Sequence, residues 1–374
     1  MQHASSIWEQ EIFLSPQDFI VIGSGLVGLW CAWELQSKFP SARITILEKS
    51  IVPSGASTRN AGFACFGSPT ELIADLQQLG AERVWTIAAM RFKGIEKTRQ
   101  LFGDSFIDFE NSGGYECLDE AAGRKVQEHL DLLNHGMASI TGKAQTFSWC
   151  NEKLNTLGLS GFKYLVQNDL EGGLHSGKLV QAFMHRVKNA GVTILTGVKV
   201  NQVQDGAGGM IVHTDTDHQF KAATVLYCTN AFTSELLPAT NITPARGQVL
   251  VTSPIENLQL KGTFHYDEGF YYFRNVGNSV LIGGARNRAF DEEQTTTWNT
   301  TDTIQQELER FLADHVLKGA RYTIQIRWSG TMGFTANKQP LIEPIGNNAL
   351  VINACNGMGV ALSPMVAEQV AAYF

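Results

Sequence analysis

Apolar residues in the first fifty positions follow two different spacings in turn. Residues 18–22 (DFIVI) form a short apolar run rich in isoleucine and valine, which is typical of a buried strand. Residues 26–38 have the length and apolar content of a helix, and residues 43–47 form a second strand-like run that ends on Glu48. We therefore predict a strand–helix–strand unit with parallel strands over residues 18–50.

The same patterns divide the rest of the chain. They predict two helices within 70–103 and further helices over 119–137, 176–188, 303–317 and 360–372. They predict strands over 114–118, 192–195, 199–203, 224–228 and 349–353, and a strand-rich stretch over 247–284 with a turn at Gly277 and Asn278. The strands near residues 20, 45, 195, 226 and 350 are expected to share one nucleotide-binding fold, so two domains are interleaved in sequence.

A glycine-rich turn joins the first predicted strand to its helix. Gly23, Gly25 and Gly28 form G-x-G-x-x-G, in which the glycines permit a tight turn, close approach of a pyrophosphate and close packing of helix on strand. The helix that begins at Leu26 offers free N–H groups to phosphate. Glu48, at the end of the second strand, can accept hydrogen bonds from a ribose hydroxyl. This arrangement predicts a dinucleotide site.

Composition and charge narrow the class of protein. The chain has 374 residues, with 44% hydrophobic and 17% charged, which is typical of a globular protein of two domains. The net charge of −7 and the lack of any basic run argue against nucleic acid as a partner. Six cysteines stand without paired spacing, which disfavours a disulfide framework or a metal site and favours reduced thiols in the cytoplasm: Cys31, Cys65, Cys117, Cys150, Cys228 and Cys355.

Two apolar segments resemble membrane spans at first sight. Residues 19–35 are explained by the strand–helix unit, and residues 349–374 are interrupted by asparagine, glycine and proline. The first thirteen residues contain Glu9 and Glu11 and no cationic region, so we do not expect a signal peptide. We expect a cytoplasmic protein with no membrane span.

Further motifs follow in a fixed order along the chain. They are SGASTRNAG at 54–62, PARGQVL at 244–250, GFYYFRN at 269–275, VLIGG at 280–284, RWSGTMGFTANKQPLI at 327–342 and NGMGVALSP at 356–364. Together they resemble the D-amino acid oxidase-like FAD oxidoreductases, the group that includes glycine, sarcosine and γ-glutamylputrescine oxidases. Within this group the chain is most similar to the amine-oxidising branch.

The resemblance implies an α/β fold. It consists of a Rossmann-like FAD-binding domain (1–75, 150–240 and 330–374) and a substrate-binding domain of antiparallel sheet and helices (76–149 and 241–329). The small residues of SGASTRNAG suit a phosphate and the flavin edge, although such a run also occurs in plain surface loops. Beside the three glycines, the resemblance assigns these cofactor neighbours: Leu26, Glu48, Lys49, Ser54, Ala56, Ser57, Arg59, Asn60, Ala61, Gly62, Val200, Thr229, Asn230 and Gly330. For Val200 the alternative to contact with the cofactor is a place in the core.

The last predicted helix has a chemical role in this family. Reduced flavin carries negative charge near N1 and O2, and a helix N-terminus stabilises that charge. Gly357, Met358, Gly359 and Val360 would provide the N–H groups, and relatives often have histidine where Met358 stands. No cysteine stands near Gly330 and no histidine in SGASTRNAG, so we expect noncovalent FAD.

Two departures from the family bear on the reaction. Its amino acid oxidases bind the substrate carboxylate with an arginine, and the aligned residue is Met332. The loss of a bidentate arginine–carboxylate pair argues for an amine that is recognised elsewhere. The alternatives for such an arginine are Arg274, Arg286, Arg288 and Arg327. Leu281 replaces a lysine of the fast oxidases, which leaves both an oxidase and a dehydrogenase open.

Aromatic residues supply the candidates for contact with substrate. They are Tyr271 and Tyr272, followed by Phe66 and His265, and the thioether of Met332 joins them. The alternative is burial in the core for the tyrosines and a structural role for His265. Because side chains alternate along a strand, Tyr271 and Tyr272 cannot face the same side.

We expect an FAD-dependent enzyme that oxidises a C–N bond by hydride transfer to flavin N5, giving an imine that hydrolyses. The alternatives are an amino acid dehydrogenase, a 2-hydroxy acid dehydrogenase with His265 as base, and a flavin-binding subunit of a larger complex. The electron acceptor is O2 or another compound, and the sequence does not indicate the oligomeric state.

Overall fold

The computed structural model describes residues 5–216, 218–353 and 356–374, which divide into two compact units. The first unit comprises the described residues of Met1–Thr58, Gly177–Pro244 and Met332–Phe374. The second comprises Arg59–Ser176 and Ala245–Thr331. The predicted stretches 59–75 and 150–176 therefore fall in the second unit instead of the first. They do so because their strands, β3 (Phe63–Ala64), β6 (Tyr164–Asn168) and β7 (Gly172–Gly173), pair within that unit.

The first unit is built on a parallel sheet. Its central strands lie in the order β18 (Ala349–Asn353), β11 (Gln219–Tyr227), β1 (Gln17–Ile22), β2 (Ile44–Glu48) and β8 (Thr193–Thr196). These are the strands predicted near residues 350, 226, 20, 45 and 195, so the prediction of one shared sheet is confirmed. Three further strands extend the sheet, with β17 (Leu341–Ile345) on β18, and β9 (Val200–Gly206) on β10 (Gly209–Thr214), which pairs with β11.

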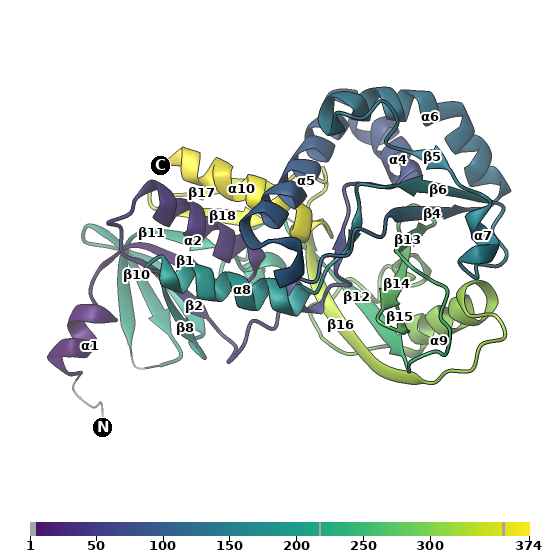
Figure 1. Ribbon diagram of the computed structural model, residues 1–374. Coiled ribbons are helices and arrows are strands. Elements are labelled where there is room, and N and C mark those ends of the chain that lie inside the picture. Colours follow the sequence, from purple (N-terminus) through teal and green to yellow (C-terminus); the bar gives the residue numbers. More distant parts are fainter. Residues whose placement is uncertain (1–4, 217, 354–355) are drawn as a thin grey trace. The chain divides into compact units, whose positions relative to one another are not determined.

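Two largely apolar helices lie side by side in this unit, as Figure 1 shows. They are α2 (Leu26–Lys38), which follows the glycine turn, and α10 (Gly359–Tyr373) at the end of the chain. Trp30 of α2 also makes an edge contact of 4.7 Å with Phe183 of α8 (Ser176–Asn189). Because α2 packs against neighbours on several sides, its apolar residues are not confined to one stripe. The short α1 (Ile7–Ile12) begins with a capping box at Ser6 and Glu9.

The second unit is built on a mostly antiparallel sheet. Its order is β16 (Ile324–Phe334), β12 (Thr243–Thr252), β15 (Ser279–Gly284), β14 (Tyr271–Val276), β13 (Thr263–Tyr266), β4 (Gly114–Leu118), β6 and β5 (Ser148–Trp149). The hairpin between β14 and β15 turns at Gly277 and Asn278, as predicted. Its helices are α4 (Pro69–Leu79), α5 (Ala81–Phe102), α6 (Glu120–Thr141), α7 (Lys153–Thr156) and α9 (Asp302–Phe311), and α3 (Ala56–Arg59) includes the boundary between the units.

The two faces of this second sheet differ in polarity. One face carries Phe264 and Phe273, whose rings stack at 5.0 Å, and it packs against Phe311 at the end of α9. The opposite face carries Glu116, His265 and other polar side chains, since side chains alternate along each strand. The apolar face forms the core of the unit and the polar face is available for chemistry.

Some predicted boundaries differ from those observed. The helix predicted over 303–317 ends at Phe311 and continues as a π-helical turn, Leu312–Val316. The five described cysteines are free thiols, and Cys355 lies outside the described residues. Among the described residues, no helix combines the length and the apolar character that crossing a membrane requires.

Candidate functional site

The glycine turn of the first unit can be formed only by glycines at its tightest points. Gly23 has φ of 103°, and a Cβ atom there would lie 2.7 Å from the carbonyl oxygen of Cys228. A Cβ atom on Gly28 would overlap the carbonyl oxygen of Gly23. The first turn of α2 therefore packs directly against the turn, with its N–H groups at the carboxyl end of β1, which is where a phosphate binds in such folds.

The first half of SGASTRNAG lies against this turn. Ser57 Oγ accepts a hydrogen bond of 2.9 Å from the backbone N–H of Leu26, and it would lie 3.0 Å from a Cβ atom on Gly25. Ser54 shares a 2.7 Å hydrogen bond with the hydroxyl of Ser50, and Ala56 begins α3. Two motifs that are separated in sequence thus meet at the N-terminus of α2.

Glu48 is held in place by the chain around the turn. One carboxylate oxygen accepts from Ser24 N at 3.0 Å and from Ser24 Oγ at 2.8 Å, and the other accepts from Ser50 N at 3.0 Å. Each oxygen has two lone pairs, so the second oxygen has capacity for another hydroxyl. Glu48 is therefore oriented and still able to accept a bond from a ribose.

The other predicted cofactor neighbours of this unit surround the same edge of the sheet. Lys49 Nζ lies 3.9 Å from the ring centroid of Phe232, and the buried Val200 begins β9. Asn230 has φ of 51°, and its Oδ1 accepts from Gly333 N at 3.1 Å, while the Thr229 hydroxyl bonds that of Thr233 at 2.8 Å.

The start of α10 forms a second glycine turn. Gly357 has φ of 84°, and Met358 is the N-cap residue without a side-chain cap. Gly359 and Val360 are the first helical residues. The Met332 sulfur would lie 3.8 Å from a Cβ atom on Gly357, so Met332 lies beside the N-terminus of α10. This helix end offers N–H groups and the positive end of its dipole.

These observations fit FAD. A β-strand, a turn that has no room for side chains, an uncapped helix end and an oriented acid provide what a pyrophosphate and a ribose require. The α10 N-terminus provides what a reduced flavin ring requires. The described residues contain no group of three His, Cys, Asp or Glu side chains arranged to hold a metal ion.

In the second unit, Arg59 connects three segments. Its guanidinium lies 4.3 Å from the ring of Trp298 and donates to the carbonyl oxygen of Ser329 at 2.9 Å. Trp328 Nε1 donates to the Arg59 carbonyl oxygen at 2.9 Å. A Cβ atom on Gly330 would lie 2.9 Å from Arg59 Cβ, so glycine is required where β16 passes Arg59.

The end of SGASTRNAG is held by Asn60 and Arg274. Asn60 Oδ1 accepts from Gly62 N at 2.8 Å and from Ser176 Oγ at 2.6 Å. Arg274 is buried and donates to the Gly62 carbonyl oxygen at 2.6 Å and to the Leu174 carbonyl oxygen at 3.0 Å. Ala61 lies between these anchored residues. Arg274 thus fixes the backbone and is not a candidate for binding a substrate carboxylate.

Tyr271 and Tyr272 face opposite sides of the sheet, as their alternation predicts. The Tyr271 ring stacks on Phe311 at 4.7 Å, and its hydroxyl donates to Glu307 at 2.6 Å, so it belongs to the core beside α9. Burial raises its pKa to about 12. Arg288 donates to the Tyr271 hydroxyl at 3.1 Å and belongs to the same cluster. We therefore remove both Tyr271 and Arg288 from the proposed substrate site.

Tyr272 lies on the polar face together with His265. Both contact the ring of Phe63, at 5.8 and 5.1 Å between centroids. A Cβ atom on Gly283 would lie 2.5 Å from the Tyr272 ring, so this glycine lets the ring lie flat on β15. Burial lowers the pKa of His265 to about 4, and the imidazole is neutral at pH 7.

Of the remaining predicted arginines and aromatic residues, some stabilise the fold and one stays a candidate for contact with substrate. Arg327 bonds Gln305 and Glu309 and stabilises α9. Arg286 lies near Tyr272, so it stays a candidate for contact with substrate. Phe66 is fully buried against Phe92, 5.5 Å away, in the packing of the helices.

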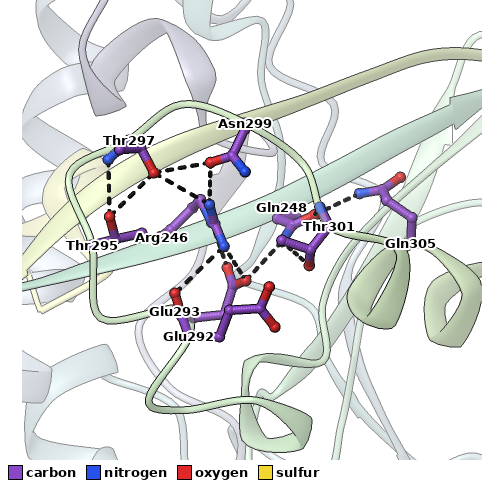
Figure 2. Close-up of polar contacts among 9 residues, drawn as sticks. All are labelled: Arg246, Gln248, Glu292, Glu293, Thr295, Thr297, Asn299, Thr301 and Gln305. Carbon is purple, nitrogen blue, oxygen red and sulfur yellow. Dashed lines mark hydrogen bonds and ion pairs between the residues drawn. The ribbon is translucent and has the colours of Figure 1, made fainter.

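A buried polar cluster that the sequence did not reveal as a cluster surrounds Arg246 (Figure 2). Arg246 donates to both carboxylate oxygens of Glu293, at 2.9 and 2.6 Å, and also to Thr297 and Asn299. Gln248 joins the cluster through Glu293 and Thr301. The motif PARGQVL was the available signal, and its arginine and glutamine fasten residues 292–301 to β12. Trp298, which contacts Arg59, lies in this segment.

Comparison with known proteins identifies the family. The model of the family described as FAD dependent oxidoreductase (DAO) matches residues 18–373. The chain is 25% identical over 361 residues to the probable oxidoreductase OrdL of Rhizobium meliloti (strain 1021), covering 92% of this chain and 80% of that protein. It is 22% identical over 333 residues to L-2-hydroxyglutarate dehydrogenase of Escherichia coli (strain K12), covering 81% and 73%.

The fold is also shared with a solved structure. The crystal structure of glycine oxidase from Geobacillus kaustophilus has a TM-score of 0.73 at 20% identity, covering 95% of this chain and 94% of that one. This confirms the mixed α/β fold, and the family model, which spans nearly the whole chain, identifies the cofactor as FAD. The chain belongs to the DAO family of FAD-dependent oxidoreductases.

Proposed function

We propose that this protein oxidises the C–N bond of a small amine or amino acid derivative. FAD, when bound, supplies the acceptor at N5 for the hydride that leaves the α-carbon of the substrate. The product is an imine, which water hydrolyses. The protein's own residues bind the neutral amine, orient its C–H bond and exclude water.

The observation that carries the proposal is the place of Met332. It lies beside the Gly357 turn at the N-terminus of α10, where the family resemblance would put a carboxylate-binding arginine. A thioether has no charge and donates no hydrogen bond, so it cannot pair with a carboxylate. Met332 therefore favours a substrate whose reacting end is an amine without a carboxylate at that position.

The polar face of the second sheet supports the same reading. Phe63, His265 and Tyr272 form an uncharged surface of rings, because the imidazole is neutral and burial raises the Tyr272 pKa to about 12. Such a surface favours the neutral amine over the ammonium form, and only the neutral amine can release a hydride from its α-carbon. Arg286, beside Tyr272, is the candidate for an acidic group elsewhere on the substrate.

Oxidation of a 2-hydroxy acid is the second candidate. A relative named L-2-hydroxyglutarate dehydrogenase covers 81% of the chain and supports it. This reaction needs a base for the hydroxyl proton. His265 has the required imidazole, but its lowered pKa of about 4 makes it a weak base at neutral pH, so we place the amine first.

The test is anaerobic bleaching of the flavin band by a panel of amines, amino acids and hydroxy acids. We expect bleaching by an amine. Bleaching by hydroxy acids alone would overturn the proposal, and no bleaching by any compound would favour a subunit that needs a partner. Readmitting air distinguishes an oxidase from a dehydrogenase, and release of the flavin by acid precipitation tests noncovalent attachment.

Met332→Arg tests whether Met332 lies in the substrate site, and Met332→Leu is the matched uncharged control. The arginine variant should bind carboxylated amines at least about tenfold better relative to plain amines, since a charged hydrogen-bonded pair contributes about 1.5–3 kcal/mol. The leucine variant should keep the original preference. An unchanged preference in the arginine variant would place Met332 outside the substrate site.

A further inference from the structure

A small cavity lies on the polar face of the second sheet, between the sheet and the start of α4. Its volume is about 10 Å³, and its lining combines apolar side chains such as Phe147 and Val166 with the polar side chains of Glu116, Asn168, Glu171 and His265. A cavity of about 10–15 Å³ holds one water molecule when polar partners surround it. Gly114 and Glu116 lie on β4, Asn168 on β6 and His265 on β13. The pairing of these strands brings the side chains together, with Gly114 opposite Asn168 and Glu116 opposite His265.

One group on the wall of this cavity needs a hydrogen-bond partner. Asn168 is only 3% exposed, and its Nδ2 has no hydrogen-bond acceptor, although its Oδ1 accepts from Leu170 N at 3.0 Å. A buried unpaired amide N–H costs about 1–3 kcal/mol, so a polar molecule in the cavity would be stabilised by it.

Two buried carboxyl groups complete the lining, and both are oriented by the turn before α4. Glu116 is 1% exposed and accepts hydrogen bonds from the Thr70 backbone and hydroxyl and from Ser68. Glu171 is 3% exposed and accepts from Phe66 N at 2.7 Å. Among residues 5–216, 218–353 and 356–374, no ion pair involves either carboxyl group. This combination of one donor, one imidazole and two acids matches water, which both accepts and donates.

We propose that the cavity binds one water molecule and that this water joins Glu116, Glu171 and His265 into a buried site that holds an exchangeable proton. Burial raises the pKa of Glu116 to about 7 and that of Glu171 to about 8, so these carboxyl groups exchange protons near neutral pH. The other ionisable groups that influence the site are Glu71 on α4, Arg91 on α5 and the thiol of Cys65. Arg91 is paired with Glu71 at 3.0 Å.

The site has a role in the reaction, and this role rests on the proposed function. An amine substrate arrives largely as an ammonium ion and must lose a proton before its α-carbon releases a hydride. The N–H bond of the ammonium breaks, its electron pair stays on nitrogen, and an O–H bond forms on a carboxylate of the site. His265 lines the cavity and also contacts Phe63, which Tyr272 contacts as well. It therefore connects the cavity to the proposed substrate surface.

The water and the proton can be tested without any substrate. A high-resolution crystal structure of the FAD-loaded protein should show a water within hydrogen-bond distance of Asn168 Nδ2, and an empty cavity would overturn the proposal. Infrared spectra of the same protein at pH 6 should contain the carbonyl band of a protonated carboxylic acid. Glu116→Gln or Glu171→Gln should weaken this band. Glu293→Gln, which changes a buried acid that is paired with Arg246, is the control and should leave it intact.

Absence of the band in the unaltered protein, or a band that both variants leave unchanged, would overturn the proton site. The role in the reaction has its own readout, the pH profile of flavin reduction by the substrate. We expect a limb near pH 7–8 that shifts in the Glu116 and Glu171 variants and not in the Glu293 control. A limb that stays in place in both variants would overturn this role. Because the crystal and infrared results do not involve a substrate, they distinguish a failure of the proton site from a failure of the proposed function.

Discussion

Replacing Arg246 by methionine should destabilise the second unit more than any substitution at an exposed ion pair. The guanidinium is 2% exposed and its partner Glu293 is 1% exposed, with the charged groups 2.6 Å apart. Methionine fills much of the volume but leaves the Glu293 carboxylate buried, with Gln248 as a hydrogen-bond donor. Breaking a buried pair in this way costs about 3–5 kcal/mol, because an uncompensated charge remains in a medium of low dielectric constant.

The double variant Arg246→Met with Glu293→Leu separates this cost from the value of the contact. Removing both charges leaves no buried charge, so the double variant should recover a large part of the lost stability. Arg124→Met is the matched control, since Arg124 is 74% exposed and pairs at the surface with Glu120, which is 52% exposed. Such a pair contributes about 0–1 kcal/mol.

The assay is urea unfolding of the FAD-loaded protein, followed by circular dichroism. Limited proteolysis within residues 292–301 gives a second readout, because the cluster in Figure 2 fastens this segment to β12. A loss below about 1 kcal/mol in Arg246→Met would refute the reasoning. A double variant less stable than the single variant would refute it as well, because the cost would then come from packing and not from charge.

Three further predictions concern the cofactor, the buried acids and Tyr271. Gly28→Val should abolish retention of FAD, because its side chain would overlap the Gly23 turn, whereas Gly55→Ala, which has open space, should keep the flavin absorbance. The free energy of unfolding should fall as pH rises from about 4.5 to about 8, and it should fall less steeply below pH 6.5, where the buried neutral His265 has the opposite effect. Both buried acids hold their proton in the folded protein after the unfolded chain has lost it, and the rise of the Glu116 pKa from 4.5 to about 7 corresponds to at most about 3 kcal/mol. Glu171→Gln should flatten this dependence, and an equally steep fall in that variant would contradict it. Tyr271→Phe should cost about 1.5 kcal/mol in urea unfolding through its lost bond to α9 and leave flavin bleaching unchanged; slower bleaching would return this tyrosine to the substrate site.

The sequence by itself determined the parts of the protein that depend on local chemistry. The run from β1 to β2 was predictable because a buried strand, a glycine turn and a helix each have a short-range signature. The same holds for the turn at Gly277, where few residues other than glycine and asparagine adopt a positive φ. The ordered motifs indicated the family, and the pattern of strands predicted that five distant strands share one fold.

Only the tertiary structure decided which side chains face one another. The alternation of Tyr271 and Tyr272 was evident from the sequence, but which of them enters the core depends on the placement of α9. Arg274 has a structural role because its guanidinium donates hydrogen bonds to two carbonyl groups from distant segments. Glu116 and His265 became neighbours through the register of β4 and β13, which are almost 150 residues apart in the chain. Pairing between distant strands depends on the packing of the whole unit, which no local pattern encodes.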